Sequence, residues 1–329
     1  MTMDTMHLCT AADRRYALPM ATLINSIIDK CSSGPVVVHV LQTDIPHRMM
    51  RKLHKMCAGT NVSLDFVDMS GYKFDFDLSA TPHWTSAIFY RIMIPEIFSN
   101  LDKIIYIDAD TLMLGDFRAL WDKEIPDEYM VAMVSDKYCT LQQREILNLK
   151  QYHNSGMILF KLDKCREFNF GKKCLDWLAA NHRIAFYPDQ DAINVVLQGK
   201  IFRLLNEFNW QIVPKQARLL TELPTTHRMI HFLTPTKPWC AGIHPLLGRL
   251  YEPYIPFPLS RARIWLMHRM NWFGRKIVRY DLESECKEGI VSEYHKVYLF
   301  GYVIFKKRLR RENMDVISFL KQRCGYGQK

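Results

Sequence analysis

The chain has 329 residues, of which 48% are hydrophobic and 24% charged, and its formal net charge is +10. This composition is typical of a globular protein, and the length is enough to bury one core of about 250 residues and leave a tail. The nine cysteines are scattered and never spaced as C-x-x-C, which argues against a zinc ribbon or a disulfide framework and favours a reducing compartment.

Neither secretion nor a membrane span is predicted. Met1 to Met6 lead directly into strand-like residues, without a basic segment followed by an apolar run. The longest clean apolar stretch, Val297 to Phe305, has nine residues, whereas a spanning helix takes roughly 20. We therefore expect a cytoplasmic protein.

Predicted strands and helices alternate along the first part of the chain. Hydrophobic periodicity predicts strands at 7–10, 36–41 and 62–67, with helices at 16–29 and 47–56 between them. This βαβαβ order predicts an α/β fold with a mostly parallel sheet and right-handed crossovers.

The same patterns continue toward residue 200. We expect helices at 86–98, 164–180 and 189–198 and strands at 103–107, 130–134 and 156–160.

The strand Lys103 to Ile107 ends in Asp108-Ala109-Asp110. Because side chains alternate along a strand, we expect Asp108 and Asp110 to project to the same side and to meet one cation. Two hard oxygen ligands at the carboxyl edge of a buried strand suit Mn²⁺ or Mg²⁺ carrying a diphosphate. The alternative is a solvated turn, since D-x-D triplets are common.

Residues 259–329 differ in character from the rest. They hold 16 Lys and Arg against 7 Asp and Glu, while residues 1–258 hold 28 against 27. Three prolines between Pro253 and Pro258 mark a boundary, so we expect a catalytic domain at 1–258 and a helical, basic and aromatic extension at 259–329.

Basic residues of this extension interleaved with Trp, Phe and Leu favour attachment to an anionic membrane. The alternative is a solvated helical face that packs on the main domain. Binding to nucleic acid is not expected, because no recognisable module is present.

Six segments in this order resemble glycosyltransferase family 8, whose retaining enzymes build outer cores of bacterial lipopolysaccharide and lipooligosaccharide. They are Thr10–Asp13, Ser86–Arg91, Lys103–Asp110, His153–Gly156, Tyr187–Asp191 and Ile230–Trp239. The resemblance covers roughly residues 7 to 240. It implies the GT-A fold, a Rossmann-like, mostly parallel central sheet flanked by helices.

The resemblance also implies a nucleotide site after the first strand. In the family, an Asp at the position of Asp13 reads the uracil, and small residues such as Ala11 let the base approach the backbone. The family commonly has Asn where this chain has Arg15, which leaves the base, the ribose or a phosphate as the partner of Arg15. Tyr16 and Ala109 are assigned to the same nucleotide site. The alternative for Asp13 is a plain helix cap.

Several further residues are implied to act on the donor sugar. In the family, an Arg at the position of Arg91 contacts the sugar and the D-x-D carboxylates, and the Gln corresponding to Gln190 lies beneath the anomeric carbon. The remaining assignments are Asp136, Asn154, Ser155 and Asp189. Each has a structural alternative: a surface ion pair for Arg91, a turn for His153–Gly156, and a helix start for Pro188 with Asp189. The apolar neighbours of Arg91 favour its burial, which requires a partner such as Asp108.

The last segment completes the metal site. By resemblance, His231 joins Asp108 and Asp110 as a ligand, and Lys237 neutralises diphosphate oxygens. The family often has Gly where this chain has Thr234, so the resemblance does not imply a close approach of that backbone to phosphate.

The resemblance predicts a retaining, metal-dependent hexosyltransferase. It would move galactose or glucose from a UDP-sugar to a saccharide or glycolipid acceptor at the inner face of the cell membrane. The alternatives are a UDP-sugar hydrolase and a silent carbohydrate-binding protein. Because Gln190 is a poor nucleophile, front-face substitution is favoured over a transient adduct on Asp189 or Asp136.

Overall fold

The computed structural model describes residues 3–72, 74, 86–181, 184–213, 219–223, 225–233, 237–240, 244–266, 278–287, 290–299 and 302–313. The chain forms two compact units. The first comprises Met1–Ile212, Thr221–Leu233 and Tyr254–Pro256, and the second comprises Val213–Leu220, Thr234–Pro253 and Phe257–Lys329.

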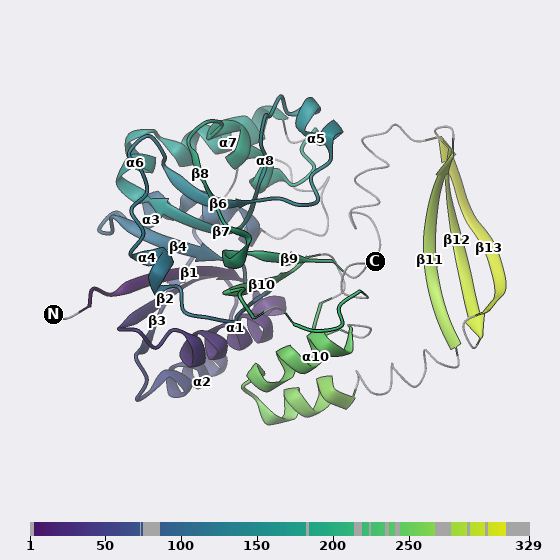
Figure 1. Cartoon of the computed structure of the whole chain (residues 1–329), viewed down its shortest axis with the longest axis horizontal. Helices are drawn as coiled ribbons and strands as arrows, with labels where there is room; N and C mark the ends of the chain where they lie inside the picture. Colours follow the sequence, from purple (N-terminus) through teal and green to yellow (C-terminus); the bar gives the residue numbers. More distant parts are fainter. Residues whose placement is uncertain are drawn as a thin grey trace. The chain divides into compact units, whose positions relative to one another are not determined.

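A seven-stranded sheet with the order β3-β2-β1-β4-β7-β6-β8 is the centre of the first unit (Figure 1). Its strands are β1 (Met6–Ala12), β2 (Val36–Gln42), β3 (Val62–Asp68), β4 (Lys103–Ile107), β6 (Val131–Ser135), β7 (His153–Lys161) and β8 (Ile201–Leu204). All neighbours pair in parallel except β7, which is antiparallel to both β4 and β6. The predicted α/β fold with a mostly parallel sheet is confirmed.

Helices flank this sheet. They are α1 (Ala17–Lys30), α2 (His47–Cys57), η2 (Ser86–Met93), α3 (Ile94–Ile97), α4 (Arg118–Trp121), α5 (Leu141–Ile146), α6 (Leu162–Glu167), α7 (Phe170–Asn181) and α8 (Pro188–Val196). The 3₁₀ turns η1 (Arg14–Tyr16) and η3 (Asn206–Phe208) also belong to the first unit. A further 3₁₀ turn, η4 (Glu252–Tyr254), spans the point in the sequence where the second unit gives way to the first.

One apolar cluster joins the sheet to η2, α3, α6, α7 and α8. It includes Phe89, Ile158, Phe160, Leu178 and Ile193, all with at most 1% of their surface exposed. Each such side chain contributes about 1.5 to 3 kcal/mol when it leaves water. This packing places the N-terminus of α8 near the start of β7.

A second sheet of three short strands has the order β5-β10-β9. Its strands are β5 (Thr111–Met113), β9 (Trp210–Ile212) and β10 (Met229–Phe232). The antiparallel pairing of β10 with β5 sets His231 opposite Thr111, the residue after Asp110. The backbone N–H of Phe232 also donates to the carbonyl of Asp110 at 3.1 Å. Residues about 120 positions apart in the sequence are thereby held side by side.

Two expected helices are interrupted. The segment predicted as a helix at 86–98 is the 3₁₀ helix η2 followed by α3, because Pro95 has no N–H to continue a regular α-helix. The segment predicted at 164–180 is divided into α6 and α7. Between them Asn169 has a φ of 55°, the left-handed conformation that ends helices.

In the second unit, α10 (Pro245–Tyr251) is followed by a helical segment at 258–266 and an antiparallel sheet of β11 (Val278–Lys287), β12 (Ile290–Leu299) and β13 (Tyr302–Asn313). The expected helical extension is therefore wrong for these three strands. Their sequences are rich in Val, Ile, Tyr and Phe, which have high β-propensity. Residues 259–266 are helical as expected, and the rest of the expected extension, residues 267–277, 288–289, 300–301 and 314–329, lies outside the described residues. None of the helices in the described part of the chain is long and apolar enough to cross a bilayer.

Two imidazoles and a carboxylate form a row across β1, β2 and β3. His7 Nδ1 lies 3.0 Å from His39 Nε2, and His39 Nδ1 lies 2.8 Å from Asp65 Oδ2. Burial lowers the pKa of His39, although Asp65 acts in the opposite direction. Burial and the neighbouring His39 lower the pKa of His7. The folded chain therefore favours neutral imidazoles at both positions.

This row predicts loss of stability in mild acid. A histidine whose folded pKa is depressed contributes stability above its unfolded pKa of about 6.5, and this contribution is lost as the pH falls through the lower folded value. The melting temperature should fall between about pH 7.5 and pH 5, and His39→Gln should flatten that fall. Exposed His47→Gln is the matched control. A wild-type melting temperature that stays constant on acidification would contradict the prediction.

Candidate active site

The candidate site lies at one edge of the central sheet. Asp108 and Asp136 directly follow the parallel strands β4 and β6, while Asn154 lies at the beginning of β7. Because β7 runs antiparallel to its neighbours, its first residues share an edge with the last residues of β4 and β6. Open α/β sheets bind their ligands at this carboxyl edge.

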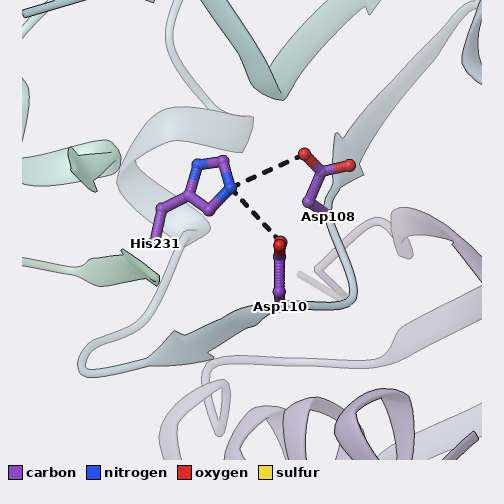
Figure 2. Close-up of side chains that lie close together, drawn as sticks. All are labelled: Asp108, Asp110 and His231. Carbon is purple, nitrogen blue, oxygen red and sulfur yellow. Dashed lines mark ion pairs between the residues drawn. The ribbon is translucent and has the colours of Figure 1, made fainter. Parts of the chain in front are cut away.

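Two carboxylates and one imidazole converge there (Figure 2). His231 Nε2 lies 3.2 Å from Asp110 Oδ1 and 3.6 Å from Asp108 Oδ2. One ligand atom from each residue lies within 4.8 Å of the others, so the three could hold a metal ion together. The sequence-based expectation that Asp108 and Asp110 lie close to His231 is confirmed.

Tyr106 and Arg91 fix the position of the Asp108 carboxylate. Its Oδ1 accepts a hydrogen bond from the Tyr106 hydroxyl at 2.7 Å and an ion-pair contact from Arg91 Nη2 at 2.7 Å. Arg91 Nη1 reaches Oδ2 at the longer distance of 3.4 Å. The two short contacts occupy Oδ1, which leaves Oδ2 directed toward His231.

Arg91 is buried and connects the Asp108 carboxylate to α8. Its Nε lies 3.2 Å from Asp189 Oδ2, its Nη1 donates to the Ser155 carbonyl at 2.9 Å, and its guanidinium carbon lies 4.7 Å from the Tyr106 ring centroid. Burial disfavours the charged form, but Asp108, Tyr106 and Asp189 outweigh it and raise the pKa of Arg91 above its ordinary value. Burial raises the pKa of Asp189, while Arg91 opposes that rise. Arg91 thus stays cationic, as the sequence led us to expect of a buried Arg with a carboxylate partner.

The Gln190 amide is bonded on both sides. Its Oε1 accepts from the Ser155 backbone N–H at 2.9 Å and from Asn154 Nδ2 at 3.1 Å, and its Nε2 donates to Asp136 Oδ2 at 3.0 Å. The other oxygen of Asp136 accepts the backbone N–H groups of Tyr138 and Cys139. Gln190 is therefore held in one orientation.

These contacts join nine residues into one connected set, which we call the polar network. Its members are Arg91, Asp108, Asp110, Asp136, Asn154, Ser155, Asp189, Gln190 and His231. Four of its members are carboxylates and one is a guanidinium, which pairs with Asp108 and Asp189, so a bound cation would offset the excess of negative charge. Every member was identified from the sequence.

Among the residues expected to bind the base, Asp13 has a structural role in the described contacts. Asp13 Oδ1 accepts the backbone N–H groups of Arg15 and Tyr16 at 2.8 and 3.0 Å and so caps η1. The Arg15 side chain is exposed, while Ala11 and Tyr16 are partly buried. This cap is the structural alternative expected for Asp13. Both cap contacts use Oδ1, so the assignment of Asp13 to the base stays a prediction.

Ala109 and Lys237 are the two other residues that the sequence assigns to this site. Ala109 is buried between the two D-x-D carboxylates. Lys237 belongs to the second unit, so its assignment stays a prediction.

Sequence reasoning missed Tyr106, Asn209 and Asp191. Strand alternation could have identified Tyr106, which lies two residues before Asp108 and points to the same side. Asn209 Nδ2 donates to Asn154 Oδ1 at 2.8 Å, a contact for which the sequence offers no signal.

Asp191 holds the segment that leads into α8. Its carboxylate accepts the Tyr152 hydroxyl and the backbone N–H groups of Phe186 and Tyr187. Burial raises the pKa of Asp191 to about 7, although these hydrogen bonds act in the opposite direction. Asp191 therefore positions Asp189 and Gln190 from outside the polar network.

Gly156 gives the imidazole its space. A Cβ atom at this position would lie 2.1 Å from His231 Cε1 and 2.9 Å from Asp108 Oδ2. The donor set of two carboxylates and an imidazole, fitted against a residue without a side chain, suits a divalent cation.

The sheet order and this edge site fit the GT-A fold. The profile of Glycosyl transferase family 8 matches residues 7–241, and the chain belongs to that family. The resemblance found in the sequence is confirmed.

Curated relatives agree with this assignment. Lipopolysaccharide glucosyltransferase WaaO of Escherichia coli is 28% identical over 240 residues, which cover 69% of this chain and 69% of the relative. Lipopolysaccharide 1,3-galactosyltransferase of Salmonella typhimurium is 22% identical over 321 residues, covering 93% and 91%. The solved structure of galactosyltransferase LgtC with donor and acceptor sugar analogues shares the fold, with a TM-score of 0.64, 19% identity and coverage of 76% and 95%.

Gly156→Ala should disable the site without unfolding the chain. The added methyl group must displace the His231 ring, so we expect affinity for Mn²⁺, measured by calorimetric titration, to fall at least about tenfold. Gly71→Ala is the matched control, since a Cβ there meets nothing within 4 Å. Equal Mn²⁺ affinity in the two variants would show that the ring does not depend on this space.

Proposed function

We propose that the protein is a retaining, cation-dependent hexosyltransferase. It would move galactose or glucose from a UDP-sugar to a saccharide acceptor of the lipopolysaccharide or lipooligosaccharide type. The convergence of Asp108, Asp110 and His231 is the single observation that carries this proposal. The names of the two lipopolysaccharide transferases among the relatives support the choice of hexose and acceptor.

Mn²⁺ suits the proposed metal site better than Mg²⁺. Carboxylates bind either ion, but an imidazole ligand such as His231 favours transition metals. When bound, the cation would neutralise negative charge that builds on the leaving diphosphate. By family resemblance, Lys237 would add a mobile positive charge to the same oxygens.

The remaining residues would bind and orient the donor. Arg91 and Asp189 form a buried ion pair. Their side chains would donate hydrogen bonds to sugar hydroxyls and accept hydrogen bonds from them. By family resemblance, Asp13, Ala11, Arg15 and Tyr16 would bind the nucleotide. Their contacts with the base stay proposals.

Retention of configuration is proposed to follow a front-face route. The anomeric C–O bond to UDP breaks, a bond forms between the acceptor oxygen and the anomeric carbon on the same face, and the acceptor proton passes to the leaving phosphate. Gln190 Oε1 already accepts hydrogen bonds from Ser155 and Asn154, which makes it a poorer nucleophile still. The alternative is an adduct on Asp189 or Asp136, which trapping would reveal.

A transfer assay tests the proposal against UDP-sugar hydrolysis. The purified chain is incubated with Mn²⁺ and UDP-galactose or UDP-glucose, with and without lipooligosaccharide. Release of UDP that requires the acceptor supports transfer, and equal release without it supports a hydrolase. No release under either condition supports a silent carbohydrate-binding protein.

We also propose that the second unit attaches the enzyme to an anionic membrane surface. The motivation is the charge of residues 259–329, including Lys306, Lys307, Arg310 and Arg311 on β13. Each basic residue near such a surface contributes about 1 kcal/mol. The acceptor would then be a glycolipid at the cytoplasmic face.

Asp110→Ala should lower the turnover number by about 10² to 10³, with little change in melting temperature, because it removes a metal ligand rather than core volume. Asp102→Ala is the control, since this exposed residue lies just before β4. Retention of full transferase activity by Asp110→Ala would contradict the site.

Replacing Lys306, Lys307, Arg310 and Arg311 with Gln should release the protein from phosphatidylglycerol vesicles in a sedimentation assay. About 1 kcal/mol per residue predicts a loss of affinity of roughly 10² or more. The matched control replaces four basic residues of α2, namely Arg48, Arg51, Lys52 and Lys55. Equal sedimentation of the two variants at physiological salt would refute attachment through β13.

A further inference from the structure

The orientation of the Asn154 amide is set by two groups whose hydrogen-bonding roles are unambiguous. The backbone N–H of Gly156 lies 3.1 Å from Asn154 Oδ1 and can only donate. A carboxylate oxygen of Asp136, Oδ2, lies 3.3 Å from Asn154 Nδ2 and accepts. A flipped amide would set donor against donor and acceptor against acceptor, so the carbonyl oxygen must face Gly156.

Two further contacts agree with this orientation. Gln190 Oε1 lies 3.1 Å from Asn154 Nδ2, and the Ser155 backbone N–H identifies that Gln190 atom as the oxygen. On the opposite side, Asn209 Nδ2 donates to Asn154 Oδ1 at 2.8 Å, and the Asn209 side chain is fully buried. The Asn154 amide is thus locked by neighbours on both sides.

The same carbonyl oxygen faces the imidazole. Asn154 Oδ1 lies 3.2 Å from His231 Nδ1. Since an amide oxygen only accepts, His231 must carry a hydrogen on Nδ1. Its other nitrogen, Nε2, points to Asp108 and Asp110 (Figure 2).

We propose that Asn154 is a positioning residue that fixes His231 in the Nδ1-protonated form and thereby reserves Nε2 as a cation ligand. Asn209 supports it by holding the Asn154 amide in place. The inference rests on the cation site of the proposed function. It also divides the Asn154 amide into two parts, with Oδ1 serving the metal site and Nδ2 serving Gln190 and Asp136.

Two substitutions separate these parts. Asn154→Asp keeps an acceptor for His231 Nδ1 but removes the donor to Gln190 and Asp136, so turnover should fall while Mn²⁺ affinity, measured by calorimetric titration, stays within about threefold. Asn154→Leu removes both, and Mn²⁺ affinity should fall by about 10 to 100-fold, the usual effect of losing a partner that orients a metal-bound histidine. Where Asn154→Leu fails to fold, Asn154→Ala carries the same expectation.

The matched control for the exchange of an amide for a carboxylate is Asn25→Asp. Asn25 donates to the Tyr254 carbonyl at 2.9 Å and belongs to α1. We expect it to change neither Mn²⁺ affinity nor turnover.

A second measurement does not depend on the cation. Long-range ¹H–¹⁵N NMR of the metal-free, ¹⁵N-histidine-labelled full chain, recorded in basic solution where imidazoles are neutral, reports which ring nitrogen is protonated. The His231 signal is identified by its loss in His231→Gln. Nδ1 should be protonated in the wild type and in Asn154→Asp, and Nε2 should be protonated in Asn154→Leu.

The possible failures are distinguishable. An unprotonated Nδ1 in the wild type, or full Mn²⁺ affinity in Asn154→Leu, would overturn the positioning role. A wild-type chain that binds no Mn²⁺ while Nδ1 stays protonated would instead overturn the cation site and leave the tautomer assignment standing.

Discussion

The antiparallel pairing of β10 with β5 is the constraint on which the site depends. Its register sets His231 opposite Thr111, directly after Asp110. A shift by one residue would turn the imidazole to the other face of the small sheet. The contacts of His231 with Asp108 and Asp110 are therefore a consequence of backbone hydrogen bonding between segments far apart in the sequence.

The polar network shows how the fold keeps several charges away from water. Arg91 pairs with Asp108 and Asp189 and lies against Tyr106. A buried charge without partners costs several kcal/mol, and removing one partner of a buried pair typically costs about 3 to 5 kcal/mol. The guanidinium thus stabilises one of the carboxylates that would hold the cation, so the site is preorganised before any ligand binds.

Much of the fold and site could be predicted from local patterns. Alternating strands and helices predicted the parallel sheet, and the Asp108-Ala109-Asp110 triplet lies where a strand of that sheet ends. The interruptions at Pro95 and Asn169 also have local causes, yet they were missed because apolar spacing continues across them. The strands β11 to β13 were missed because basic and aromatic content was given more weight than β-propensity.

The remaining features depend on tertiary contacts. The position of Asn209 beside Asn154 follows from the way η3 and β9 meet the sheet edge, and no spacing in the sequence encodes it. A turn is the structural reason that the sequence offers for Gly156, whereas the structure shows that the His231 ring occupies the space that a side chain there would fill. Only the assembled site reveals this second reason for a glycine.

The most direct test of the central claim is a calorimetric titration of UDP into the full chain with Mn²⁺ and with EDTA. If Asp108, Asp110 and His231 hold a cation that binds the diphosphate, UDP should bind in Mn²⁺ and lose at least about tenfold in affinity in EDTA. Equal UDP affinity under both conditions would contradict the account.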